Sequence, residues 1–235
     1  MEEMELKTSL KQRIAIIVIA VLMLGSVIAG YVAIVASRGG ASKATSGEIT
    51  EEKLAQYEEE YKAKLEEFHT ATAEDYGKFS RYLGEITAYN EATANSEGVK
   101  TKDLREGSGR ELTTGDTNYL AYYVGWCADE TIFDSSLDST TEPTAFDKAL
   151  DASLGLIEGW NTGVVGMKLG GVRVITVPGE LAYGESMEIC GGYNKPLKFM
   201  IMAVAKEDPL MTLSAELDTA YMKYQYGLYG MDYGD

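Results

Sequence analysis

The chain has 235 residues, and its 21 lysines and arginines against 37 aspartates and glutamates give a formal net charge of −16. This excess of acidic residues excludes a surface that could neutralise nucleic-acid phosphates, so we expect no nucleic-acid partner. One histidine and two cysteines are too few for a typical zinc site, and we predict no metal and no cofactor.

The first predicted element is a membrane-spanning helix at residues 14–36. No charged residue occurs in this range. At a rise of about 1.5 Å per residue, it is long enough to cross a hydrocarbon core of about 30 Å. Lys7, Lys11 and Arg13 precede it, which favours a cytoplasmic location for residues 1–13 and an external location for the rest. A cleavable signal peptide is the alternative, although its apolar region is normally only about 7–15 residues long.

A flexible linker and an acidic helical segment are predicted next. Residues 37–49 are small, polar and glycine-rich, which is typical of a flexible spacer. Residues 50–98 contain two sets of apolar residues at helical spacing, and this pattern predicts two helices. The first set is Leu54, Tyr57, Tyr61, Leu65 and Phe68, and the second is Tyr76, Phe79, Leu83, Ile86 and Tyr89.

Each apolar stripe is too narrow for a free-standing helix, so the two helices must cover another apolar surface. One interpretation is that they pack on each other or on the next domain. The alternative is a chaperone arm or a dimerising coiled coil, which would make the protein a homodimer through these helices. His69 lies in this charged stretch and is expected to be a solvated helix residue.

From residue 99 to residue 206 the pattern changes to short β-rich runs, which predicts a separate domain. Strands are expected at 119–126, 172–177 and 197–204, where aromatic, β-branched and strongly apolar residues follow one another. Residues 156–167 carry apolar residues at helical spacing. One short helix among antiparallel strands predicts an α+β fold, in which a curved antiparallel sheet wraps around the helix.

Residues 207–235 form an acidic, tyrosine-rich C-terminal tail. Apolar spacing predicts a short helix at about 212–224. Two alternatives are equally open for this tail: it docks on the domain, or it is disordered.

Four short motifs follow one another in the predicted domain. They are Tyr123-Val124-Gly125, Phe133-Asp134-Ser135-Ser136, the run GWNTGVVGMKLGGVR from Gly159 to Arg173, and the run VPGELAYG from Val177 to Gly184, with Pro196-Leu197-Lys198-Phe199 after them. In sequence and in order they resemble the Y-T-G, F-D-S-S, G-W-x-x-G-V-x-x-M-K-x-G-x-x-R and V-P-x-x-L-A-Y-G motifs of FK506-binding proteins. The resemblance covers residues 99–206.

This resemblance implies a peptidyl-prolyl cis-trans isomerase with an aromatic pocket for a proline ring. Carried over by position, the catalytic pocket would have Trp160 as its floor, Tyr123, Phe133, Ile157 and Phe199 as its walls, and Asp134 beside the twisting amide. Tyr183 would donate its hydroxyl to a substrate carbonyl, and the backbone N–H of Ile157 would hold another. Leu156, Phe146 and Ile189 are further candidates for substrate contact.

The segment after Tyr183 departs from the family pattern. Where the family has an apolar Ile-Pro-Pro segment over the pocket, this chain has Cys190-Gly191-Gly192-Tyr193, so the affinity for a macrolide ligand is left open. In the family's fold, the strand end that bears Cys127 and this segment both flank the pocket. The resemblance therefore implies a disulfide between Cys127 and Cys190, and two separate thiols are the alternative.

The sequence predicts a membrane-anchored prolyl isomerase that assists the folding of exported or cell-surface proteins. Its partners would be proline-containing polypeptides and the membrane, which it crosses once at 14–36, with the isomerase domain outside the cytoplasm. The alternative is a binding module of the same fold that acts as a membrane-tethered chaperone or scaffold without catalysis.

Overall fold

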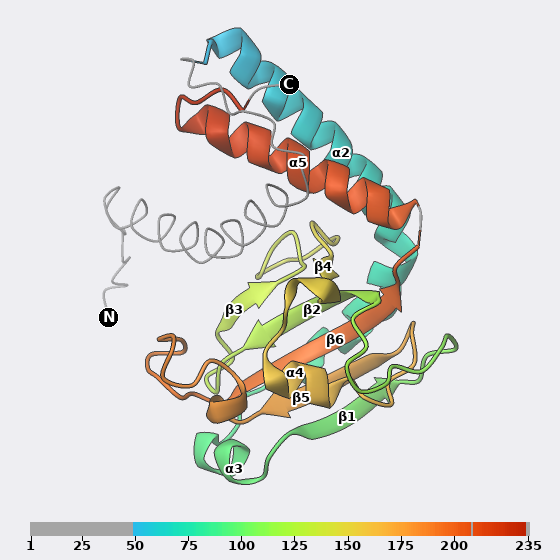
Figure 1. Cartoon of the computed structure of the whole chain (residues 1–235), viewed down its shortest axis with the longest axis vertical. Coiled ribbons are helices and arrows are strands. Elements are labelled where there is room, and N and C mark those ends of the chain that lie inside the picture. Colours follow the sequence, from blue (N-terminus) through green and yellow to red (C-terminus); the bar gives the residue numbers. More distant parts are fainter. Residues whose placement is uncertain (1–48, 208, 234–235) are drawn as a thin grey trace, which may run out of the picture. The chain divides into compact units, whose positions relative to one another are not determined.

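The computed structural model describes residues 49–207 and 209–233, and the folded unit extends from Ile49 to Met231 (Figure 1). The predicted cytoplasmic N-terminus, the membrane helix at 14–36 and nearly all of the linker lie outside these ranges. Within them, no helix has both the length and the apolar character needed to cross a membrane. In chain order the elements are α2 (Glu51–Phe79), η1 (Ser80–Glu85), α3 (Glu91–Ser96), β1 (Lys100–Arg105), β2 (Tyr119–Trp126), β3 (Ile132–Ser135), β4 (Leu150–Asp151), η2 (Ala152–Leu154), α4 (Glu158–Gly163), β5 (Val172–Val177), η3 (Gly179–Leu181), β6 (Leu197–Ala205) and α5 (Leu210–Leu228).

A six-stranded antiparallel sheet forms the centre of this unit. Its strand order is β1-β5-β6-β2-β3, and β4 pairs with β2 as well. β2 and β6 are paired over the whole of β2, from Tyr119 opposite Ala205 to Trp126 opposite Lys198. The expected strands correspond to β2, β5 and β6, so the predicted α+β fold with an antiparallel sheet and a short helix is confirmed for the domain.

Both faces of the sheet are buried at β2, β5 and β6, because alternate residues of these strands face different cores. The first core includes Tyr119, Tyr123, Trp160, Ile175, Phe199 and Ile201, and the second includes Phe68, Phe79, Tyr122, Trp126, Phe146 and Met200. Every residue of β2 is buried. A strand of this kind requires a cover on each side of the sheet.

Helix α4 covers the first face, and two glycines let it approach the sheet closely. A Cβ atom on Gly159 would lie 2.1 Å from Cγ1 of Val177, and one on Gly163 would lie 2.8 Å from Cγ2 of Ile175. The buried Arg173 of β5 donates to the carbonyl oxygens of Gly163 and Val165 at 3.0 and 2.9 Å. The helix is therefore fixed to the sheet at its end, and it is shorter than the expected 156–167.

Helix α2 covers the second face. Its Phe68 ring packs edge-on against Tyr122, and its Phe79 ring packs against Phe146. The two helices expected in residues 50–98 are one helix as far as Phe79, because a glycine such as Gly77 weakens a helix by only about 1 kcal/mol. The interpretation that this segment packs on the next domain agrees with these contacts.

The other half of α2 packs against α5, so the C-terminal tail docks as a helix. Tyr61 lies 5.5 Å from Tyr221 and 5.7 Å from Tyr224 between ring centroids. Lys223 of α5 pairs with Glu60 of α2 at 3.1 Å. The apolar stripe that raised the homodimer alternative is thus covered within the chain.

Two residues lie elsewhere than expected. His69 is half-buried, and its Nε2 atom is enclosed without a hydrogen-bond partner in the described part of the chain, so the expectation of a solvated side chain was wrong. Phe146 stacks on Tyr122 with ring centroids 4.0 Å apart, in the second core. It therefore lies on the opposite face of the sheet from Tyr123, and not in the expected pocket.

Replacement of Phe146 by alanine should lower the free energy of unfolding by about 3–5 kcal/mol, because a buried ring leaves a cavity when it is removed. Urea denaturation followed by circular dichroism measures this difference. Tyr229→Ala is the control, since Tyr229 is 54% exposed and should change the stability by at most about 0.5 kcal/mol. Equal stabilities of the wild-type protein and Phe146→Ala would contradict this placement.

Candidate active site

Four aromatic rings from β2, β3, α4 and β6 meet on the first face of the sheet. Between ring centroids, Trp160 lies 5.5 Å from Tyr123 and 5.3 Å from Phe199. The rings of Phe133 and Phe199 are 5.6 Å apart by the same measure. All three pairs have the edge-to-face geometry that aromatic rings prefer. Trp160, Tyr123 and Phe199 are buried and Phe133 is partly exposed, so the cluster has an apolar floor and an accessible wall.

Backbone register and one glycine place these rings. Gly125 of β2 lies opposite Phe199 of β6, and a Cβ atom on Gly125 would lie 2.6 Å from Cζ of Phe133 and 3.0 Å from Cδ1 of Phe199. Only glycine leaves room for both rings at this position. The indole N–H of Trp160 donates to the Tyr119 hydroxyl at 3.1 Å, which orients the floor of the cluster.

Asp134 is anchored at the edge of the rings by three donors. The Tyr123 hydroxyl donates to its Oδ2, Nζ of Lys148 donates to its Oδ1 at 3.0 Å, and the backbone N–H of Ser135 donates to Oδ1 at 2.9 Å. The carboxylate is therefore fixed although its side chain is 48% exposed. Burial, together with the charge of Asp134, raises the pKa of Tyr123, so this phenol stays protonated and continues to donate.

Two donors near the rings are unused. Tyr183 and Ile157 both pack against the first core. Among the described residues, neither the Tyr183 hydroxyl nor the Ile157 backbone N–H has a hydrogen-bond acceptor. Burial and the nearby Asp134 raise the pKa of Tyr183, which keeps its hydroxyl protonated at neutral pH. Both groups are available to an oxygen atom of a bound molecule.

The structure brings nearly all of the predicted site residues to one place. The residues that belong to the first core or pack against it are Tyr123, Phe133, Leu156, Ile157, Trp160, Tyr183, Ile189 and Phe199. Phe146 does not join them. Sequence reasoning missed Tyr119 and Lys148: Tyr119 could have been found, because it has the same strand parity as Tyr123. Lys148 lies in an irregular stretch that carries no periodic signal.

A disulfide fixes the loop that carries Ile189. Cys127 follows β2 and is bonded to Cys190, with a distance of 5.5 Å between their Cα atoms. The N–H and carbonyl groups of Ile189 and Gly192 bond each other at 2.9 and 3.1 Å, and Cys190 and Gly191 have φ angles of 55° and 75°. Two successive positive φ angles are typical of a type I′ turn. This turn is thereby attached to the end of the central strand.

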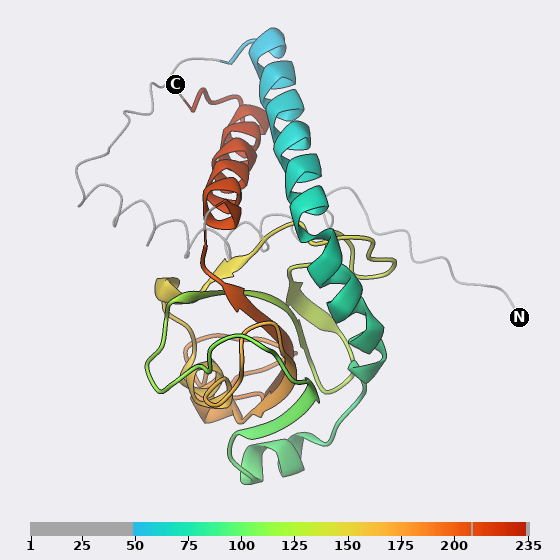
Figure 2. The same ribbon diagram turned by 90° about the vertical axis from the view of Figure 1, so that its right-hand side faces the viewer.

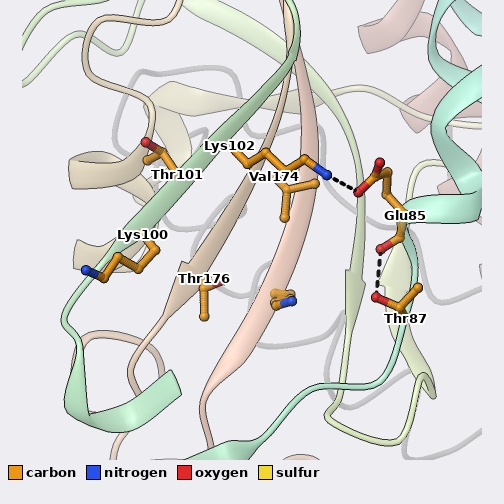
Figure 3. A pocket seen from close by; sticks show the side chains of 8 residues that line it. Glu85, Thr87, Lys100, Thr101, Lys102, Val174 and Thr176 are labelled. Atoms are coloured by element: carbon orange, nitrogen blue, oxygen red, sulfur yellow. Dashed lines mark hydrogen bonds and ion pairs between the residues drawn. The ribbon is translucent and has the colours of Figure 1, made fainter. Parts of the chain in front are cut away.

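A second feature is a cavity of about 260 Å³, whose lining is drawn in Figure 3 and includes none of the four rings. Its lining is polar for the most part and also includes Val174, which belongs to the second core. Lys102 and Glu85 form an ion pair of 2.7 Å across it. None of the predicted site residues lines this cavity, so it is not part of the candidate site.

Comparison with known proteins identifies relatives of the domain. The family model for FKBP-type peptidyl-prolyl cis-trans isomerases matches residues 109–203. An FK506-binding protein of Neisseria meningitidis serogroup B is 40% identical over 110 residues, which cover 46% of this chain and 92% of that protein. FK506-binding protein 4 of Aspergillus fumigatus is 33% identical over 102 residues, which cover 43% of this chain and 20% of that protein. The crystal structure of AtFKBP13 is 29% identical, covers 48% of this chain and 96% of that chain, and has a TM-score of 0.36.

Replacement of both cysteines, Cys127→Ala with Cys190→Ala, should lower the free energy of unfolding by about 4 kcal/mol. The disulfide joins residues 63 positions apart, and its loss restores the chain entropy of the unfolded state. Denaturant titration of oxidised wild-type protein and of the double variant measures the difference. Thiol titration of the oxidised native wild-type protein provides an independent check, in which two free thiols would contradict the pairing.

Proposed function

Because the chain belongs to the FKBP-type peptidyl-prolyl cis-trans isomerase family, we propose that it catalyses rotation about X–Pro bonds in the aromatic cluster described above. The observation that carries this proposal is the meeting of four rings beside an anchored carboxylate, with two unused donors next to them. The substrates are proline-containing polypeptides, whose proline ring would rest on Trp160.

The chemistry of the reaction suits an apolar site of this kind. Unassisted X–Pro rotation has a barrier near 20 kcal/mol and takes about tens of seconds. Most of the barrier is lost amide resonance, so the reaction needs no nucleophile. A dry aromatic surface favours the twisted imide, because this is less polar than the planar, resonance-stabilised one. Each ~1.4 kcal/mol of preferential binding of the twisted imide accelerates rotation about tenfold.

The polar groups would hold the chain on either side of the twisting bond. The Tyr183 hydroxyl and the Ile157 N–H would each donate to a substrate carbonyl, which fixes the two ends while the imide turns. Asp134 would lie beside the bond itself, in the orientation set by Tyr123 and Lys148. Leu156 and Ile189 would complete the apolar surface around the substrate.

A second candidate function is a binding module that acts as a chaperone or scaffold without useful catalysis. The observation that favours it is the turn at residues 189–192, which stands where the family has an Ile-Pro-Pro segment. The replacement of these apolar residues by Cys190-Gly191-Gly192-Tyr193 would weaken contacts on that side of the substrate. The same difference bears on macrolide affinity, which direct titration with such a ligand would measure.

We further propose that residues 14–36 anchor the protein in the cell membrane, with the isomerase domain outside the cytoplasm. The uncharged stretch and the basic residues before it support this orientation. The disulfide supports it as well, because disulfides persist in oxidising compartments. The substrates would then be exported or cell-surface proteins. A homodimer through α2 would need a surface other than its covered apolar stripe.

Asp134→Ala and Tyr183→Phe should each lower kcat/KM for isomerisation of a proline-containing peptide by about two- to tenfold, because each removes one polar interaction with the reacting segment. A coupled peptide assay, or the refolding of a protein limited by proline isomerisation, measures the rate with the full chain in mild detergent. Tyr193→Phe is the matched control, since Tyr193 is 53% exposed in the same loop. If both variants match the wild-type rate, the binding-module function is preferred.

External protease added to intact cells should digest the domain, because the proposed orientation places residues 37–235 outside. Immunoblotting with an antibody against the domain detects the loss, and a cytoplasmic protein serves as the control for intact membranes. Complete protection would rule out this orientation. A soluble mature form that begins near residues 41–45 would show instead that residues 14–36 are a cleaved signal.

A further inference from the structure

Residues 87–95, here called the strap, run from the end of η1 into α3 (Figure 2). They precede the residues that the family model matches, which begin at residue 109. Besides the end of β2, they contact residues 178–196, here called the site loop, which includes Tyr183 and Ile189. The strap therefore contacts both ends of the loop in which this chain departs from the family motifs.

The start of the site loop is bonded to α3. Oδ1 of Asn95 accepts a hydrogen bond from the backbone N–H of Gly179 at 2.8 Å. Gly179 begins η3, and the chain then continues through Leu181 and Ala182, which pack on the first core, to Tyr183. The position of Gly179 is restricted further, because a Cβ atom there would lie 2.1 Å from the carbonyl oxygen of Asn194.

The end of the site loop is bonded to the strap at two more points. The Tyr89 hydroxyl donates to the carbonyl oxygen of Pro196 at 2.8 Å. Nζ of Lys195 pairs with Oε2 of Glu91 at 2.8 Å. These two contacts hold the loop directly before β6, which carries Phe199 of the aromatic cluster.

The strap is itself attached to the end of β2. The backbone N–H of Tyr89 donates to the carbonyl oxygen of Ala128 at 3.1 Å, and the indole N–H of Trp126 donates to the carbonyl oxygen of Thr87 at 3.1 Å. Cys127 lies between Trp126 and Ala128 in the chain, and its disulfide holds the middle of the site loop. The strap and the disulfide thus both connect the site loop to the same end of β2.

We infer that the strap positions the site loop, and that Asn95 is a positioning residue of the isomerase site, acting through Gly179 on Tyr183. The loop is held at its start by Asn95, in its middle by the disulfide and at its end by Tyr89. These three attachments restrict the backbone of the loop, which Gly191 and Gly192 would otherwise make more flexible. The inference rests on the proposed function, since it concerns the placement of a donor for the substrate.

The kinetic test compares three variants in the full chain. Asn95→Ala should lower kcat/KM for a proline-containing peptide by about two- to tenfold, because it removes the acceptor of the Gly179 N–H. Asn95→Asp keeps that acceptor oxygen and should restore the wild-type value to within about twofold. Ser96→Ala alters the same short helix without touching the loop, and should leave kcat/KM unchanged.

A double-mutant cycle distinguishes positioning from a general loss of structure. If Asn95 acts through Tyr183, then Asn95→Ala should have little further effect on kcat/KM in the Tyr183→Phe background. Full additivity of the two effects would overturn the inference. An unchanged kcat/KM for Asn95→Ala in the wild-type background would overturn it as well.

Amide hydrogen exchange provides a readout that does not depend on activity. In Asn95→Ala the amide of Gly179 should exchange about two- to tenfold faster, and so should the amides of Gly184 and Asn194, which bond within the loop. Unchanged exchange at all three amides would overturn the inference. A wild-type protein without isomerase activity would refute the proposed function alone, and the exchange rates would then decide whether the strap holds the loop.

Discussion

The burial of β2 on both faces is the constraint on which the rest of the structure depends. Alternate residues of this strand carry large rings to opposite sides, and Tyr119, Tyr122 and Trp126 are all fully buried. A single helix cannot cover both sides of a sheet, so the chain must supply a second cover from outside the residues that the family model matches. Helix α2 provides it through Phe68 and Phe79. The acidic helical segment is therefore a part of the domain, and not a spacer in front of it.

The same constraint explains how an apolar site can stay both rigid and accessible. The rings of Tyr123, Trp160 and Phe199 are supported from behind by the paired strands, and Gly125 leaves the space that Phe133 occupies in front of them. Arg173 adds to this support, because its guanidinium group joins the end of α4 to β5 and, through Asp103, to β1. Asp134 then lies at the edge of the cluster, where its carboxylate is accessible to water.

Sequence reasoning succeeded where the signal was local or carried by a motif. The bounds of β2 and β5 followed from uninterrupted runs of strand-forming residues, and the motifs placed Trp160 and Phe199 together. Phe146 could not be placed, because it lies in an irregular stretch between β3 and β4, where no period indicates which face a residue takes. The length of α2 was missed since packing on Tyr122 and on α5 outweighs the low helix propensity of its glycine. The bond between Asn95 and Gly179 joins one side chain to one backbone group, a contact that leaves no pattern in the sequence.

The bonds between the strap and the site loop also bear on the order in which the protein is completed. They join residues that are 84, 104 and 107 positions apart in the chain. Contacts between residues so far apart in the chain form late in folding, because closing a long loop costs conformational entropy before the contact stabilises the fold. During synthesis, Tyr89 and Asn95 leave the ribosome long before their partners exist. We therefore expect the bonds between the strap and the site loop to form only after β6, which lies between β5 and β2, has joined the sheet.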